Sequence, residues 1–322
     1  MYQTPAILDS VLSGLDLAAN DHFAEAESLF QRLTDIHPGS PIGPLFRAAA
    51  IHAEMLDRES PERFPEFALW LRRAHFLSQQ WKERDPRSAE PELLLGIAEG
   101  YDAVYESRWG GWFAALKKGL RSKNRFNDAL TKDSTLIDAL IGIGNYDYWK
   151  ADKTDVINWL PMIPDNRNKG LEELHQVAVS GVICRTAARG SLVWALINEG
   201  RYDEALAHAD TLTQQAPEGK APLWMKGFAN YRLYRWEEAL ALYREIAERI
   251  ESTGAGNYFN LIECAYFEAQ CLFGAGRYAE AAGACHKGLS YPAPEATRKR
   301  QSGRIGELRD LQKRLKKLLA KS

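Results

Sequence analysis

The chain has 322 residues, of which 45% are hydrophobic and 26% charged, a balance that is typical of a globular protein rather than a disordered one. Its formal net charge of −2 argues against a general affinity for polyanions. No apolar run reaches the roughly 18 residues that a membrane span needs, and the N-terminus lacks the regions of a signal peptide. We therefore expect a cytoplasmic protein, or a periplasmic one if a signal peptide was removed before this numbering begins.

Three helical hairpins are predicted before residue 134, because apolar residues recur at spacings of three and four. The second is the longest, with helices at 42–57 and 62–83. In the third, the first helix runs into the sequence Trp109-Gly110-Gly111-Trp112. The three hairpins occupy residues 5–38, 40–86 and 88–133.

An irregular unit is predicted at residues 134–185. Its first helix, at 135–150, is followed by an insertion, 151–167, whose two prolines prevent it from being one helix. The second helix resumes near Asn168. We expect the apolar residues of the insertion to pack against the helical hairpins, because they would otherwise form an exposed apolar patch. These residues are Trp159, Leu160 and Met162.

The two most regular hairpins are predicted at residues 186–219 and 220–253. Gly200 ends the first helix of this stretch, since glycine adopts a left-handed backbone without steric cost. An insertion at 251–260 separates them from the last hairpin, at about 261–292. A single helix is then expected from about 295 to 320, with an apolar stripe formed by Ile305, Leu308, Leu311, Leu315 and Leu318.

A short pattern recurs in five places: a basic residue, an aromatic residue, any residue, an acid and an alanine. We expect the aromatic ring to fill the gap between repeats and the acid to lie in the first turn of a helix, where the helix dipole favours it. The alanine should let two helices approach closely. The five copies begin at His22, Arg125, Arg201, Arg235 and Arg277.

This pattern, with a spacing of 34 residues between two of its copies, resembles the tetratricopeptide-repeat (TPR) family. A weaker likeness, through residues 141–149, is to TPR proteins associated with mitochondrial and bacterial outer membranes. The resemblance implies an all-α fold, in which residues 1–294 form a right-handed superhelix of about seven TPR-like helical hairpins. The consensus positions of one repeat are occupied by Trp194, Gly200, Tyr202, Ala205 and Pro217.

The last segment, residues 295–322, is strongly basic. From Arg298 to the end it holds ten Lys or Arg residues and two acids. We interpret it as a C-terminal capping helix that covers the last apolar face and keeps its basic side in solvent. Two alternatives stay open: contact with nucleic acid or an anionic membrane, and docking to an acidic partner such as a second copy of the chain.

The sequence carries no motif of an enzyme, a metal site or a cofactor site. It lacks HExxH, GxSxG, Walker and GxGxxG patterns, so we predict no enzyme activity and no cofactor. The four cysteines lack metal-ligand spacing and are expected to be buried thiols, with a disulfide among the three C-terminal ones as the alternative. Gly142 and Gly144 are interpreted as close helix packing rather than as a phosphate loop.

In TPR arrays the first helix of each hairpin lines a concave groove, and this register predicts a partner-binding surface. Aromatic residues, amides and an arginine suit a peptide or a partner helix, since Trp, Tyr and Arg dominate interface energies. The alternative is that these rings fill the core. The predicted groove residues are Asn145, Tyr148, Trp149, Trp194, Asn198, Trp224, Phe228, Tyr231, Arg232, Tyr266, Gln270 and Phe273.

The sequence therefore predicts a non-enzymatic TPR scaffold that binds a peptide or protein partner in a groove centred on residues 134–260. The family's carboxylate clamp for chaperone tails is missing, because its Lys and Asn positions hold other residues. Those positions are Gly190, Trp194, Trp224 and Phe228. The alternative function is a protein in which the 151–167 insertion closes a pocket for a small apolar ligand or for catalysis.

Overall fold

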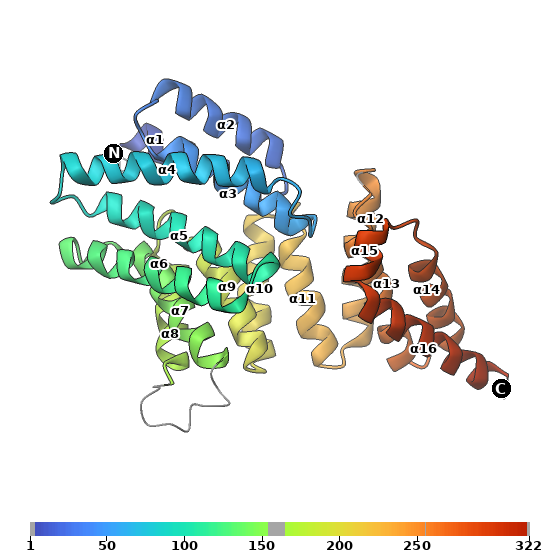
Figure 1. Ribbon diagram of the computed structural model, residues 1–322. Helices are drawn as coiled ribbons and strands as arrows, with labels where there is room; N and C mark the ends of the chain where they lie inside the picture. The colour runs from blue at the N-terminus through green and yellow to red at the C-terminus, as the bar shows by residue number, and fades with distance from the viewer. Residues whose placement is uncertain (1–3, 154–164, 255, 321–322) are drawn as a thin grey trace. The chain divides into compact units, whose positions relative to one another are not determined.

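The computed structural model describes residues 4–153, 165–254 and 256–320, and every regular element within these ranges is a helix (Figure 1). This result confirms the all-α prediction. Most of the 151–167 insertion, including Trp159, Leu160 and Met162, lies outside the described residues. Helix contacts group the chain into two compact units, residues 1–56 with 60–195 and residues 57–59 with 196–322.

The first unit is built of antiparallel helix pairs, of which α5 and α6 form the longest contact and lie side by side in Figure 1. The predicted pairs before residue 134 are all present, within two residues of their expected bounds. The helices are α1 (Pro5–Ala19), α2 (Phe23–Ile36), α3 (Ile42–Asp57), α4 (Phe64–Arg84), α5 (Glu90–Trp109), α6 (Trp112–Lys132), η1 (Ile137–Ala139), α7 (Leu140–Lys153), α8 (Arg167–Ser180) and α9 (Arg185–Asn198). The division between the two units falls within α9.

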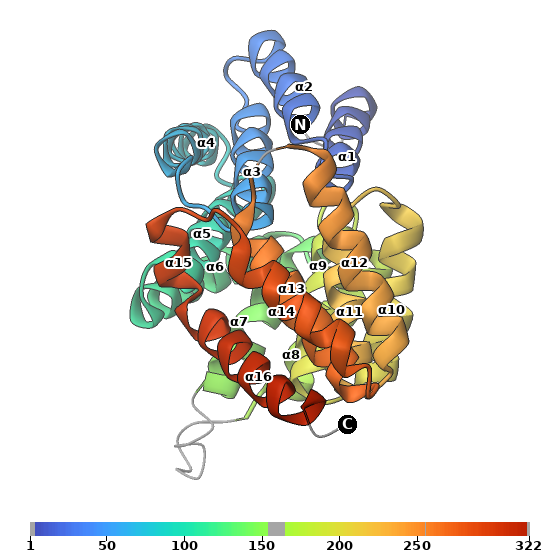
Figure 2. The same cartoon turned by 90° about the vertical axis from the view of Figure 1, so that its right-hand side faces the viewer.

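The second unit contains further hairpins and ends on a short helix, α15, followed by the longer helix α16. Figure 2 shows α16 lying along α14, and the same helix also contacts α13. The helices are α10 (Tyr202–Gln215), α11 (Ala221–Arg232), α12 (Trp236–Ser252), α13 (Tyr258–Gly274), α14 (Tyr278–Ser290), α15 (Glu295–Arg300) and α16 (Ser302–Leu319).

Small residues allow the paired helices to touch. The alanine of every copy of the recurring pattern has no exposed surface, as expected from a close helix contact: Ala26, Ala129, Ala205, Ala239 and Ala281. In the irregular unit, a Cβ on Gly144 would lie 2.8 Å from the carbonyl oxygen of Gly170, so α7 and α8 meet backbone to backbone. A Cβ on Gly142 would overlap the Phe126 ring. Both glycines therefore serve close packing, as predicted.

The basic residue of the pattern closes the turn between two helices. After α13, the amide of Arg277 donates to the carbonyl of Leu272 and that of Gly276 to the carbonyl of Phe273. These are the two hydrogen bonds of a Schellman motif, and Gly276 has the left-handed φ of +76° that the motif requires. Arg201 closes the turn after α9 in the same way, with Gly200 at a φ of +74°.

Two details of the sequence prediction are wrong. The copy of the pattern at Arg125 does not begin a helix, because α6 starts thirteen residues earlier at Trp112. Its acid, Asp128, therefore lies in the last turns of α6 and not in the first. The terminal helix is also not continuous: it breaks at Gln301, whose buried side chain donates to the carbonyl of Phe259. This anchor turns α16 so that its apolar stripe meets α14.

Replacing Gly276 with Ala should destabilise the second unit by about 1–2 kcal/mol, because a side chain is strained in the left-handed region. No atom lies within 4 Å of the added Cβ, so the cost reflects the backbone conformation alone. Gly306→Ala in α16 is the matched control, since it also meets no neighbour but should stabilise its helix by about 0.5–1 kcal/mol. Urea unfolding measures both, and equal effects would contradict the turn assignment.

Leu308→Ala should lower the free energy of unfolding by about 2–5 kcal/mol, the usual cost of a buried cavity. Leu308 has no exposed surface and packs where α14 carries Gly288. Leu319→Ala, at a side chain of the same helix that is 40% exposed, is the control and should change stability by less than about 0.5 kcal/mol. A wild-type thermal melt for Leu308→Ala would mean that α16 is a loose tether and not a cap.

Candidate interaction surface

In the second unit, α11 presents three predicted groove residues that are all half-buried: Trp224, Phe228 and Tyr231. Their spacing of four and three residues places them on one face of the helix. Two buried rings lie behind them. Tyr243 meets Trp224 edge to face at 5.8 Å, and Phe267 meets Phe228 at 6.1 Å and Tyr231 at 5.1 Å. The three surface rings are therefore held in place while one side of each stays accessible.

A charged residue, Arg232, follows this aromatic face at the end of α11. Arg232 is exposed, and its guanidinium lies 5.5 Å from the centre of the Tyr202 ring. Asn198, in the last turn of α9, is exposed as well. The guanidinium of Arg232 carries hydrogen-bond donors that suit an acidic side chain. The α11 positions of the predicted groove are thus brought together on the surface of one unit.

On α13 two of the three predicted groove residues are covered by α16. Tyr266 is buried, and the guanidinium of Arg304 lies 4.2 Å from its ring centre. Phe273 is half-buried under Arg314 at 4.5 Å. Burial, followed by a hydrogen bond with Glu307, raises the pKa of Tyr266 above its usual range. The basic side chains of α16 thus cover rings by cation–π contact, which the sequence pattern of the helix alone did not indicate.

In the first unit the predicted groove residues differ in their exposure. Tyr148 is fully buried, and its hydroxyl donates to the carbonyl oxygen of Ala195 at 3.0 Å, so it is a core residue. Trp149 is half-buried against it, and the amide of Asn145 donates within its own helix to Ile141. Trp194 is 39% exposed. Here the alternative that the rings fill the core holds for Tyr148.

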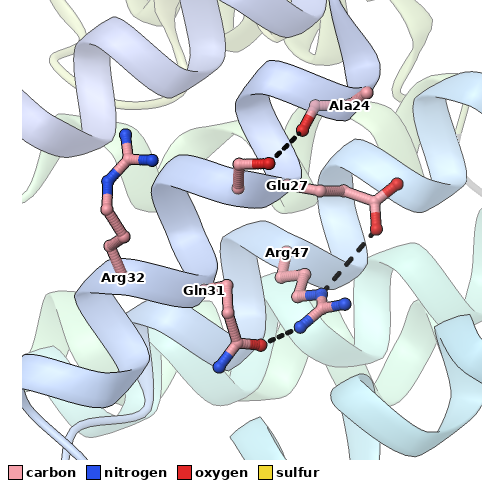
Figure 3. Close-up of a pocket in the computed structure, with 6 residues that line it drawn as sticks. Ala24, Glu27, Gln31, Arg32 and Arg47 are labelled. Carbon is pink, nitrogen blue, oxygen red and sulfur yellow. Dashed lines mark hydrogen bonds and ion pairs between the residues drawn. The ribbon is translucent and has the colours of Figure 1, made fainter.

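A polar hollow of about 470 Å³ lies between α2 and α3 (Figure 3). Arg47 reaches up from α3, donates to Gln31 and lies 3.7 Å from the carboxylate of Glu27. Arg63 also pairs with Glu27, at 2.5 Å. Because these charged groups already pair with one another, the hollow is a polar notch between helices rather than a preformed apolar pocket. The sequence patterns gave no indication of it.

Two buried carboxylates on α5 form ion pairs with cations from α4 and α6. Glu92 meets Lys82 at 2.7 Å and Lys132 at 3.3 Å, and Glu99 meets Arg125 at 3.4 Å. Burial opposes ionisation of Glu92, but the hydrogen bonds and charges of Lys82 and Lys132 outweigh it and lower its pKa. Such paired acids hold three helices together and are not poised for acid–base chemistry.

A buried histidine was also missed by the sequence analysis. His52 of α3 is only 2% exposed and lies 5.2 Å from Phe67, 5.4 Å from Tyr101 and 6.3 Å from Trp109, measured between ring centres. Its Nε2 has no hydrogen-bond partner among the described residues. Burial lowers the pKa of His52 to about 4, so the ring is neutral at pH 7.

All four cysteines are buried and free, and burial raises the pKa of each thiol. This agrees with the expectation of buried thiols rather than a disulfide. The ranges that the structure describes contain no group of three His, Cys, Asp or Glu side chains placed to hold a metal ion. Among the same residues, no helix combines the length and apolarity that crossing a membrane requires.

Successive antiparallel helical hairpins, closed by glycine turns, define a helical-repeat protein. Residues 191–253, which include α10, α11 and α12, match the family model described as tetratricopeptide repeat. This stretch of the chain therefore resembles tetratricopeptide repeats. Proteins with this fold generally mediate protein–protein interactions.

Solved structures resembling the chain include three bacterial proteins, and no curated protein matches it. A thermophilic TPR protein of Thermus thermophilus has 18% identity and a TM-score of 0.42, over 70% of this chain and 97% of that chain. The C-terminal part of a TPR repeat-containing protein from Cytophaga hutchinsonii has 14% identity and a TM-score of 0.45, over 89% and 97%. Aspartyl phosphate phosphatase F from Bacillus subtilis has 12% identity and a TM-score of 0.46, over 97% and 79%.

Acid should destabilise the first unit through His52. The unfolded histidine has a pKa near 6.5 and the folded one about 4, so the unfolded state binds more protons between these values. Stability is therefore lost as the pH falls through this window, by up to about 3 kcal/mol. His52→Leu removes this term. Urea unfolding at pH 7 and pH 4 should show a smaller loss in the variant, and equal losses would contradict a buried, neutral ring.

Proposed function

We propose that the chain is a non-enzymatic scaffold that binds a peptide or protein segment on the aromatic face of α11. The observation that carries this proposal is the set of half-exposed rings, Trp224, Phe228 and Tyr231, each backed by a buried ring. Their family context supports it, since TPR repeats are typically interaction scaffolds without enzyme activity.

The backing rings matter energetically. Ordering a flexible side chain at an interface costs roughly 0.5–1.5 kcal/mol, and a ring already fixed by its neighbours does not incur that cost on binding. Trp and Tyr also combine a large apolar surface with a polar edge, which explains why they anchor interfaces. The face of α11 therefore favours a partner segment with apolar side chains.

Arg232, the charged residue beside the rings, favours a partner that carries an acidic group. Arg232 is exposed at the end of α11 and presents a planar fork of donors that suits a carboxylate. On α13, Gln270 is half-buried, and Phe273 lies under Arg314. We therefore propose a partner segment with an apolar stretch followed or preceded by an acidic residue.

The second function considered from the sequence, a pocket closed by the 151–167 insertion, is not favoured by any described contact. Residues 154–164 of that insertion lie outside the described residues. The hollow beside α2 is lined by polar groups and does not suit a small apolar ligand.

A peptide library selected on the full-length chain tests the scaffold proposal. Phe228→Ala should weaken the selected peptides by about tenfold or more, because truncating an anchor costs over ~1 kcal/mol. Arg232→Glu, at an exposed position that folding does not need, should do the same for peptides with an acidic residue. Titration calorimetry measures both variants.

The control is Tyr234→Ala, which removes a ring that is 73% exposed in the turn after α11. It should leave the affinity within about twofold of wild type. Peptides that bind Phe228→Ala and Arg232→Glu as tightly as wild type would place the binding surface elsewhere.

A further inference from the structure

The outward face of α6 carries an apolar stripe that is independent of the proposed peptide surface. Trp112 is 38%, Phe113 82% and Leu120 43% exposed. Leu116, half-buried, follows between them at helical spacing. The opposite face of the same helix buries Phe126 against α5 and α7. This helix is therefore apolar on two sides, and only one of them is used by the fold.

Cations lie along the edge of this stripe. Lys117 is exposed, and the side chain of Arg121 is 53% exposed with only a 3.6 Å ion pair to Glu99. The helix as a whole contains six Lys or Arg residues and one acid, Asp128. Other cations of α6 turn inward, such as Lys123, which pairs with Asp147 at 2.5 Å. Those that remain outward make the stripe an apolar surface with a positive border.

The exposure of Phe113 favours a lipid surface, whose acyl chains rearrange, over a rigid protein partner. Phe113 follows the Gly110-Gly111 turn, where the α5–α6 hairpin reverses, and projects with four-fifths of its surface exposed. Among the described residues no ring contact is found for it, in contrast to Phe228 on α11. A protein partner would need a pocket shaped to this ring, whereas acyl chains rearrange around it. Trp also prefers the boundary between headgroups and acyl chains.

We propose that the outward face of α6 docks the chain onto an anionic lipid surface. Phe113 and Leu120 enter the boundary of the acyl chains, and Trp112 lies at the headgroups. Lys117 and Arg121 pair with the anionic headgroups. Binding of this kind requires both apolar penetration and negative lipid charge, and it weakens as salt rises.

Co-sedimentation of the full-length chain with vesicles tests the proposal. Vesicles of phosphatidylglycerol and phosphatidylcholine in equal parts should bind the chain at least about tenfold more tightly than vesicles of phosphatidylcholine alone. Raising the salt from 0.1 M to about 0.5 M should release it, because the Debye length falls. Equal binding to both vesicles, or no binding to either, overturns the proposal.

Two double variants separate the two contributions. Phe113→Ser with Leu120→Ser removes the apolar contact, and Lys117→Glu with Arg121→Glu reverses the charge. Each should weaken binding to the anionic vesicles by at least about tenfold. Phe113, Leu120 and Lys117 are exposed, so their replacement should leave the thermal melt unchanged. Arg121→Glu also removes the 3.6 Å ion pair with Glu99 and should lower the melting temperature slightly.

The matched control is Leu69→Ser with Phe76→Ser on α4. These two side chains are 55% and 59% exposed, lie seven residues apart like Phe113 and Leu120, and belong to the same unit. The control should bind vesicles as wild type does. If it loses as much binding as the α6 variants, the effect is general stickiness and the proposal fails. It also fails if wild type is a dimer by light scattering that Phe113→Ser with Leu120→Ser makes monomeric, without vesicle binding.

Discussion

Close contact between paired helices is the constraint on which this structure depends. Alanine or glycine stands at several places where two helices touch, as at Ala239, fully buried in α12, and at Gly144 and Gly170, whose backbones meet. Such a contact leaves no room for large side chains, so the rings must lie beside it. They then either fill the space behind a helix, as Tyr243 and Phe267 do, or remain half-exposed on its face.

The turns reinforce this arrangement with the same few residues. Arg277 closes its turn through its backbone amide, while its side chain bonds Glu280 in the next helix and Glu237 in the preceding repeat. One residue thus links three elements. Because these side chains are exposed, the ion pairs add little stability, and the backbone hydrogen bonds and glycine φ angles fix the turn.

The sequence predicts the helices well because local signals define them: proline and glycine mark the ends, and spacings of three and four mark the buried sides. It predicts the surface poorly because exposure depends on distant partners. Tyr148 can be buried because its hydroxyl donates a hydrogen bond to the carbonyl oxygen of Ala195, 47 residues away. Arg304 covers Tyr266 only because Gln301 breaks the terminal helix and redirects it. A helix with two apolar sides, such as α6, gives no local sign of which side the fold buries.

The two exposed aromatic surfaces differ in one physical respect, and that difference separates their proposed partners. On α11, buried rings hold the exposed ones in fixed positions, so a partner can be complementary to them and gain affinity from their order. On α6, Phe113 projects without such support, and its geometry specifies nothing that a rigid partner could match. Binding to a bilayer requires no complementary shape, because its strength increases with the buried apolar area and with the positive charge beside it. We therefore propose that α11 provides specific recognition and α6 provides attachment.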